Sequence, residues 1–455
     1  MAPFGKTLTV VLALAGTVPA LAAADHLRRA DRFDSATAPA GPDVRHDVRV
    51  AGAPWLRLIF KQVHLAPGDR LRITSLQDGA VQHLDATSLM QWQSTSAYFN
   101  GPAVRVELLG ERSRSRFVID QVMAGRTAAQ ARPESACRGN DAWQPSELGS
   151  WTFNARLLAS DQAPGCTAAL MANGAFATAG QCLEQPGQVR VVEFDVPASA
   201  PDGTVNHPPP SQQYVVTDQM RWARNGRGDN WGVFTTHPNS ETGLNPLQAR
   251  QHMALSLGTP PEVSQWVALK GFGVDQGREN QVQHRSIGPV HAVLPERHVL
   301  RYALDTSEQG GDWGAPVVRD GRLVAIHTQS GCDADGDGAN VGTLVTQPDF
   351  QAALVQVGGA MPAPGPACHD ILRYQAWCGN DKLHLRAFLA DASHDGQALQ
   401  VQVAGELHQV PISGSTASLT LSTRGNDGPK PVWLLTPAAC GPKATDKSHM
   451  LDWCD

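Results

Sequence analysis

Short runs of apolar residues, separated by turns that contain glycine or proline, recur along this chain and constrain its fold more than any other feature. The first run extends from Trp55 to Phe60 and is apolar except for Arg57, and a turn at 67–69 separates it from the next, Leu71 to Ile73, where apolar and polar residues alternate. Alternation with a period of two residues is typical of strands that bury one face. Since 43 glycines and 32 prolines are spread over 455 residues, turns are frequent enough for many short strands. The sequence therefore predicts an all-β protein.

The length of the chain is enough for two to four domains. Changes in composition mark an unpatterned N-terminal stretch, a polar connector and a segment rich in proline and glycine. We expect a signal peptide at 1–24, a linker at 25–47, a small β-sandwich at 48–125, a connector at 126–136, a central domain at 137–355, a linker at 356–367 and a second small β-sandwich, immunoglobulin-like in size, at 368–455.

The N-terminus has the order of features that an export signal needs. Lys6 precedes an apolar run from Leu8 to Val18, and small residues follow at Ala20 and Ala22. This run is too short to span a bilayer, so we expect cleavage near Ala22–Ala24 and a secreted protein, extracellular or periplasmic. A short buried helix is the alternative interpretation. A formal net charge of −6 and the lack of a basic block argue against a nucleic acid partner.

The cysteines also suit export. Their number is even, and no Cys-x-x-Cys pair occurs, so disulfides are a better interpretation than a metal site. We expect four disulfides among Cys137, Cys166, Cys182, Cys332, Cys368, Cys378, Cys440 and Cys454.

Three segments of the central domain share a framework with one enzyme family. They are Cys166-Thr167-Ala168-Ala169-Leu170 followed by Ala177-Thr178-Ala179-Gly180-Gln181-Cys182, Gly228-Asp229-Asn230-Trp231-Gly232-Val233-Phe234, and Gly310-Gly311-Asp312-Trp313-Gly314-Ala315-Pro316. These segments resemble the histidine, aspartate and serine motifs of trypsin-like serine proteases, of the bacterial secreted, glutamyl-endopeptidase-like type. The resemblance covers nearly half of the chain and implies a double β-barrel for the central domain. The sandwich before it, through the stretch Ser96-Ala97-Tyr98-Phe99-Asn100-Gly101, resembles a CUB-like accessory domain; a propeptide that assists folding is the other interpretation.

The residues that carry the chemistry in that family are replaced here. Its catalytic histidine, aspartate and serine correspond to Gln181, Asn230 and Trp313. A carboxamide has no useful proton affinity near neutral pH, asparagine carries no charge, and an indole is not a nucleophile. Asp229 should face away from the site, because neighbours in an extended segment point to opposite sides. The backbone N–H groups of Gly311 and Trp313 are expected to outline an oxyanion hole.

Further roles follow from the resemblance. His327 and Thr328 correspond to the lining of the specificity pocket, where a histidine meets an acidic side chain, although a purely structural histidine is an equal alternative. The resemblance also implies a Cys166–Cys182 disulfide, and we expect Cys332 to pair with Cys137.

The acidic segment that follows Cys332 resembles the start of a Ca²⁺ loop, with Asp333, Asp335 and Asp337 in alternation. An acidic turn without a metal is the other interpretation, because Leu344 stands where an EF-hand has its bidentate glutamate.

The sequence as a whole predicts a secreted, catalytically inactive protease homologue that binds a protein or peptide and needs no cofactor. Two alternatives stay open. One is an active endopeptidase that uses other residues and prefers acidic side chains. The other is an adhesion or scaffolding protein in which the sandwiches bind and the barrel is a spacer.

Overall fold

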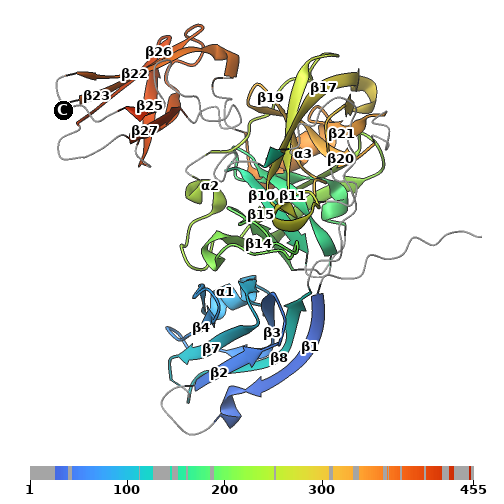
Figure 1. Ribbon diagram of the computed structural model, residues 1–455, viewed down its shortest axis with the longest axis vertical. Coiled ribbons are helices and arrows are strands. Elements are labelled where there is room, and N and C mark those ends of the chain that lie inside the picture. Colours follow the sequence, from blue (N-terminus) through green and yellow to red (C-terminus); the bar gives the residue numbers. More distant parts are fainter. Residues whose placement is uncertain are drawn as a thin grey trace, which may run out of the picture.

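The computed structural model describes residues 26–38, 44–111, 113–126, 144–145, 152–159, 162–184, 189–250, 253–306, 311–331, 338–361, 366, 368–379, 382–403, 406–422, 430–434 and 450–451 (Figure 1). The signal peptide predicted at 1–24 lies outside this part of the chain. Among the described helices, none is long and apolar enough to cross a membrane.

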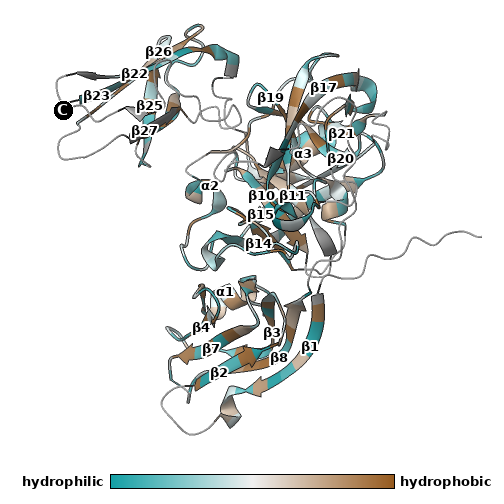
Figure 2. Ribbon diagram, in the orientation of Figure 1, coloured by the Kyte–Doolittle hydropathy of each residue, from teal (hydrophilic) through white to brown (hydrophobic). Residues whose placement is uncertain are grey.

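The N-terminal domain consists of two four-stranded antiparallel sheets. One sheet has the order β1-β8-β3-β6, with strands at His26–Asp34, Arg116–Gly125, Trp55–His64 and Phe99–Asn100. The other has the order β2-β7-β4-β5, with strands at Val44–Arg49, Ala103–Leu109, Arg70–Ser75 and Val81–Leu84. Helix α1 (Ala86–Gln91) and the short 3₁₀ helix η1 (Ser35–Thr37) complete it. Figure 2 shows hydrophobic and hydrophilic residues alternating along these strands, whose buried faces meet in one apolar core.

The linker predicted at 25–47 is wrong, because this segment supplies two strands of the domain. Strand β1 pairs along its length with β8, from His26 opposite Gly125 to Asp34 opposite Val118, with an irregularity between Ala30 and Phe33. Its sequence has no apolar alternation, since it is an edge strand held by backbone hydrogen bonds to β8 and buries little of its own surface. Such a strand leaves no periodic signal in the sequence.

The central domain begins with a closed six-stranded barrel in the order β10-β11-β12-β15-β14-β13. Its strands are Asn154–Ala159, Gln162–Leu170, Phe176–Thr178, Asn230–Thr236, Gln213–Arg224 and Arg190–Glu193. The turns η2 (Gly180–Cys182) and η3 (Pro210–Gln212) and the helix α2 (Pro246–Ala249) belong to its connections. The apolar core of this barrel includes Trp231 and a stacked pair, Phe176 and Phe234.

A second barrel follows, in which β16-β19-β20-β21-β18-β17 closes through the pairing of β16 with β17, and β9 extends the sheet. Its strands are Trp266–Gly271, Pro316–Arg319, Arg322–Gln329, Asn340–Leu344, Val299–Tyr302, His284–Leu294 and, for β9, Gln144–Pro145. The 3₁₀ helices η4 (Gly277–Glu279) and η5 (Pro295–Arg297) lie in its connections. Two closed barrels in one domain are the trypsin-like arrangement, so the predicted fold class is confirmed.

Helix α3 (Pro348–Gly358) leaves the second barrel and packs back onto the first, where Phe350, Ala353 and Leu354 join its core. The linker predicted to begin at residue 356 therefore starts too early. The paired glycines that suggested a linker end a helix instead, and Gly359, with φ +81°, follows its last turn.

The C-terminal domain has seven strands in the order β22-β23-β26-β25-β24-β27-β28. They lie at Ile371–Gly379, Lys382–Leu389, Thr416–Ser422, Glu406–Ser413, Ala398–Val403, Lys430–Leu434 and Met450–Leu451, after a 3₁₀ turn η6 at Cys368–Asp370. Alternate residues of these strands form a separate core. This domain therefore has its own apolar interior.

The N-terminal domain is joined to the first barrel through a buried polar cluster. Glu193 accepts hydrogen bonds from Arg156, at 2.6 and 2.9 Å, and pairs with Nδ1 of His207 at 2.7 Å. The imidazole of His207 stacks on Tyr98 of the N-terminal domain, with ring centres 4.4 Å apart. Gln213 of the barrel accepts from the backbone N–H of Tyr98 and donates to its carbonyl oxygen. Since Glu193 is fully buried, this junction depends on its charge being paired.

Candidate functional site

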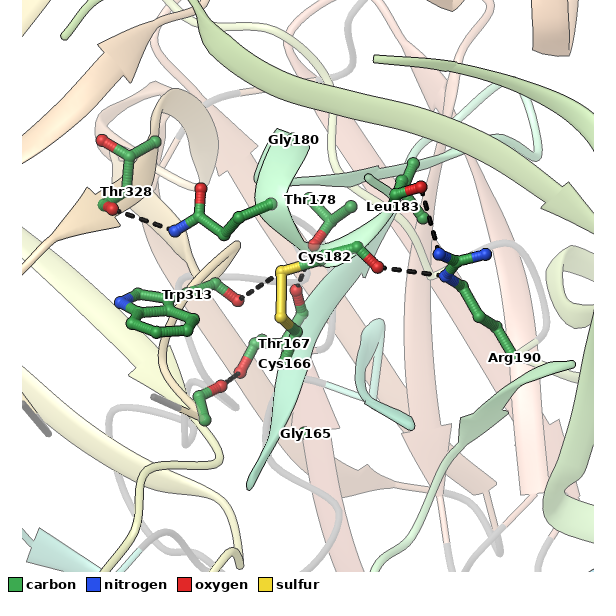
Figure 3. Close-up of a disulfide and its surroundings, with 12 residues drawn as sticks. Gly165, Cys166, Thr167, Thr178, Gly180, Cys182, Leu183, Arg190, Trp313 and Thr328 are labelled. Atoms are coloured by element: carbon green, nitrogen blue, oxygen red, sulfur yellow. Dashed lines mark hydrogen bonds between the residues drawn. A yellow bond between two sulfur atoms is a disulfide. The ribbon is translucent and has the colours of Figure 1, made fainter. Parts of the chain in front are cut away.

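A disulfide joins Cys166 on β11 to Cys182 in the turn η2, as the resemblance predicted. The same two segments are held further by Thr178, whose hydroxyl donates to the carbonyl oxygen of Thr167 at 2.7 Å. Figure 3 shows the disulfide joining the turn at Gly180 and Cys182 to the strand at Gly165 to Thr167, with Trp313 beside it. The framework of the expected site is therefore assembled.

The carboxamides of Gln181 and Asn230 lie side by side in this site. Asn230 Oδ1 accepts from the backbone N–H of Gly180 at 2.8 Å, and Asn230 Nδ2 donates to Gln181 Oε1. Gln181 Nε2 in turn donates to the carbonyl oxygen of Thr328 at 3.1 Å. Each amide group thus donates with its nitrogen and accepts with its oxygen, and the pair forms a fixed bridge between the two barrels. Neither group can remove a proton from a nucleophile near neutral pH.

Asp229 points away from this pair, as expected for the neighbour of Asn230 in an extended segment. Its Oδ1 accepts from Trp231 Nε1 at 2.9 Å and from Gln347 Nε2 at 3.0 Å. Its Oδ2 accepts from Asn225 Nδ2 at 2.8 Å. The carboxylate therefore holds the strand and the start of α3 in place, and does not supply a negative charge to the site.

The turn that carries Trp313 is fixed by backbone contacts. The carbonyl oxygen of Trp313 accepts from the N–H of Thr167 at 2.8 Å, and the N–H of Gly314 donates to the carbonyl oxygen of His327 at 2.8 Å. A Cβ on Gly314 would lie 2.1 Å from Thr178 Oγ1 and 2.3 Å from the Thr167 oxygen, and φ is +85° there. The indole is half-buried against the core of the first barrel. Figure 3 shows it directed away from the disulfide, on the side of Thr328.

The expected oxyanion hole is not formed as a pair of free donors, so that prediction is wrong for Gly311. Its N–H donates to the carbonyl oxygen of Gly165 at 2.9 Å. The carbonyl oxygen of Gly311 accepts from Thr167 Oγ1 at 2.7 Å, which locks the peptide orientation. Gly165 follows a proline, in a stretch of sequence that gave no indication of this role.

His327 lies on β20 and is fully buried. Its Nδ1 shares a hydrogen bond with the hydroxyl of Tyr302, at 2.6 Å, while Nε2 is buried with no hydrogen-bond partner among the described residues. Burial lowers the pKa of His327 to about 3, so the ring is neutral at physiological pH. Burial, and then the charge of Asp312, raise the pKa of Tyr302, which keeps its hydroxyl protonated.

Thr328, the other predicted pocket residue, makes hydrogen bonds within the protein through its carbonyl oxygen and its hydroxyl. Its carbonyl oxygen accepts a hydrogen bond from Gln181 Nε2, and its hydroxyl donates to the carbonyl oxygen of Val341 at 3.1 Å. No sequence motif pointed to Tyr302, although its hydroxyl is hydrogen-bonded to the predicted pocket histidine and orients it.

Several predicted residues lie outside the described part of the chain. They are the Ca²⁺-loop candidates Asp333, Asp335 and Asp337 and the cysteines Cys137, Cys332, Cys440 and Cys454; for Cys368 and Cys378, only the backbone is described.

Comparison with solved structures finds matches to proteases, each at low sequence identity and with a TM-score below 0.5. A Glu endopeptidase in complex with MPD has 15% sequence identity and a TM-score of 0.36, over 47% of this chain and 96% of its own. The scabies mite inactivated protease paralogue S-D1 has 14% identity and a TM-score of 0.35, over 49% of this chain and 99% of its own. The protease Anisep from Arthrobacter nicotinovorans has 12% identity and a TM-score of 0.36, over 46% and 97%. No family model and no curated protein matches the sequence. The double barrel is defined by the strand pairing of this chain, and the central domain has a serine-protease-like fold.

Proposed function

We propose that this chain is a catalytically inactive homologue of trypsin-like serine proteases and that it binds a peptide or protein ligand at the former cleft. The observation that carries the proposal is the amide bridge from Asn230 through Gln181 to Thr328, beside the indole of Trp313. A hydrolytic site of this type needs a base, a nucleophile and donors for a developing oxyanion. The bridge supplies no base, the indole supplies no nucleophile, and the N–H of Gly311 is already bound to Gly165.

A fluorophosphonate probe tests the loss of catalysis directly. We expect no covalent labelling of the full-length mature protein under conditions that label trypsin to completion. Specific labelling of any serine, abolished by heat denaturation, would overturn the proposal in favour of an active endopeptidase that uses other residues.

Restoration of the triad measures what else has been lost. The variant Gln181→His, Asn230→Asp, Trp313→Ser recreates the three reactive groups but leaves the N–H of Gly311 bound to the Gly165 carbonyl oxygen. Loss of one oxyanion donor costs about 10²–10³ in kcat, so we expect the triple variant to remain at least that far below trypsin on peptide esters. Turnover equal to that of trypsin would contradict the assignment of Gly311.

We propose that the ligand carries an acidic side chain. The tautomer in which His327 Nδ1 accepts from Tyr302 leaves an N–H at Nε2, a donor that is buried and has no partner among the described residues. A donor of this kind is costly to bury unless it meets an acceptor. A carboxylate would accept from it and, through its charge, would favour protonation of the ring.

Fluorescence polarisation with two matched peptide libraries, fixed as glutamate or glutamine at one position, tests this ligand class. Wild-type protein is expected to bind the glutamate library more tightly, and His327→Gln is expected to remove the preference. His64→Gln, which changes an exposed histidine of the N-terminal domain, is the matched control and should preserve it. Equal binding of the two libraries by the wild type would refute the acidic preference.

We also propose that the protein is secreted. The Cys166–Cys182 disulfide supports this because such bonds persist in oxidising compartments. N-terminal sequencing of the protein released by its native host should find a mature chain that begins close to residues 22–24. A retained Met1 would refute this proposal.

A further inference from the structure

Three side chains with metal-binding atoms, none of them part of the amide bridge, converge in the connection between β16 and β17. Asp275 and Glu279 lie in this connection, and His284 is the first residue of β17. His284 Nε2 lies 4.0 Å from Asp275 Oδ2 and 3.9 Å from Glu279 Oε2. All three candidate ligand atoms lie within 4.8 Å of one another. These separations are too long for hydrogen bonds between them. Tetrahedral ligands of one ion at 2.0–2.2 Å lie about 3.4 Å apart, so a small rotation of the two carboxylate side chains would bring the three atoms onto one ion.

The connection is built to hold this arrangement. Asp275 Oδ1 accepts from the N–H of Gln276 at 2.6 Å, which turns Oδ2 toward the imidazole. Asn280 Oδ1 accepts from the N–H of Asp275 at 3.1 Å, and Asn280 Nδ2 donates to the carbonyl oxygen of Gly203 at 2.7 Å. Outer contacts of this kind orient metal ligands in proteins.

The burial of the three groups is graded from the interior to solvent. The side chain of His284 is fully buried, that of Asp275 is 19% exposed and that of Glu279 is 49% exposed. An ion could therefore enter from the side of Glu279 and meet a fixed imidazole at the inner end.

We propose that Asp275, Glu279 and His284 form a binding site for a divalent transition-metal ion of the Zn²⁺ class. Two carboxylates bring a charge that matches a dication, and one imidazole nitrogen favours zinc and its neighbours over Ca²⁺ and Mg²⁺, which prefer oxygen ligands. Three protein ligands leave one position for water.

The place of the site in the fold suggests a structural role. The connection starts at Phe272, whose N–H donates to Thr167 Oγ1 at 3.0 Å, the same hydroxyl that donates to the Gly311 carbonyl oxygen. A Cβ on Gly311 would lie 2.2 Å from the Phe272 carbonyl oxygen and 2.8 Å from the Cα of Gly273. A metal that pins the connection would therefore also restrain the turn that carries Trp313.

Isothermal titration of untagged, chelator-treated full-length protein with ZnCl₂ tests the site. We expect one high-affinity equivalent of Zn²⁺ in the wild type and at least about a tenfold weaker affinity in Glu279→Gln, since changes at metal sites cost about 10–100-fold even beyond the direct ligands. Glu279 is half-exposed, so this substitution should leave the fold intact. Glu262→Gln, an exposed glutamate elsewhere in the same domain, is the control and should bind as the wild type does.

Hydrogen exchange provides a second readout that does not depend on affinity alone. Amides of residues 273–284 should exchange more slowly in the wild type with saturating Zn²⁺ than without it, whereas Glu279→Gln should show no such change at the same concentration. CaCl₂ at that concentration should slow neither protein. Zn²⁺ binding that is unchanged by Glu279→Gln, or the absence of any high-affinity equivalent in the wild type, would overturn the proposal.

Discussion

Replacement of His327 by glutamine should make the stability of the protein less sensitive to acid. The folded state holds this imidazole neutral, with a pKa lowered by burial from 6.5 to about 3. In the unfolded chain the ring takes up a proton near its ordinary pKa. The folded state is therefore favoured fully above pH 6.5, and this contribution is lost progressively as pH falls toward 3.

The size of the effect follows from these two pKa values. As the pH falls from about 7.5 to about 5, the number of extra protons bound by the unfolded state rises from about 0.1 to almost one, which lowers the unfolding free energy by about 2 kcal/mol in total. Glutamine can keep a hydrogen bond to Tyr302 and does not titrate. The wild type should thus lose about 2 kcal/mol more than His327→Gln over this range.

The assay is urea denaturation at both pH values, with each variant compared with itself so that any pH-independent cost of the substitution cancels. His64→Gln, at an exposed position, should retain the full pH dependence of the wild type. His284, whose pKa burial lowers to about 4, will keep part of the slope in all three proteins. Identical pH dependence in the wild type and His327→Gln would show that the buried ring is not held neutral, and would refute the reasoning.

Two further predictions concern the framework around the site. Gly314→Ala places a methyl group 2.1 Å from Thr178 Oγ1 at φ +85°, so it should lower the free energy of unfolding by about 3 kcal/mol or more. Gly243→Ala, with φ +68° and no atom within 4 Å of the new Cβ, is the control and should lower it by only about 1 kcal/mol. Equal urea midpoints for the two variants would contradict the close approach at Gly314. Glu193→Gln should cost about 3–5 kcal/mol in the same assay, because Arg156 is then left buried without its charge partner. Burial alone would raise the pKa of Glu193, but His207 and Arg156 lower it overall. The contribution of this carboxylate to stability should therefore be lost only as acid protonates it. An unchanged urea midpoint in Glu193→Gln at neutral pH would contradict this explanation.

The sequence predicted the parts of the fold that leave a local pattern. The apolar runs at Trp55–Phe60 and Leu71–Ile73 lie in strands β3 and β4, and the Cys166–Cys182 disulfide forms as the motifs implied. Strand β1 was missed because hydrogen bonds to β8, whose residues lie more than 80 positions away in sequence (from Asp34 opposite Val118 to His26 opposite Gly125), decide its conformation. Pairing over such a separation cannot be read from the composition of the strand itself.

In the candidate site too, the sequence indicated the residues that belong to local motifs but not the distant residues that contact them. Positions 181, 230 and 313 were singled out by the motifs, but the residues that contact them and their neighbours were not. The carbonyl oxygen of Gly165 accepts a hydrogen bond from the N–H of Gly311, and the hydroxyl of Tyr302 orients His327. Neither Gly165 nor Tyr302 belongs to a sequence motif that would have predicted its role. The spacing of Asp275, Glu279 and His284 is likewise no known metal motif, and only the path of the connection brings these side chains together.

The glycines of the Trp313 turn bear on how such motifs should be interpreted. Gly311 has φ +83° and faces the Phe272 carbonyl oxygen, while Gly314 has φ +85° and faces Thr178 and Thr167. Both glycines are required by positive φ and by neighbouring atoms that leave no room for a Cβ, whether or not a nucleophile lies between them. Their presence is therefore evidence for the packing of two barrels and carries no information about hydrolysis. The informative positions are 181, 230 and 313, where the backbone geometry does not demand one residue type. The side chains of Gln181 and Asn230 complete hydrogen bonds and that of Trp313 fills space, and none of the three supplies a base or a nucleophile.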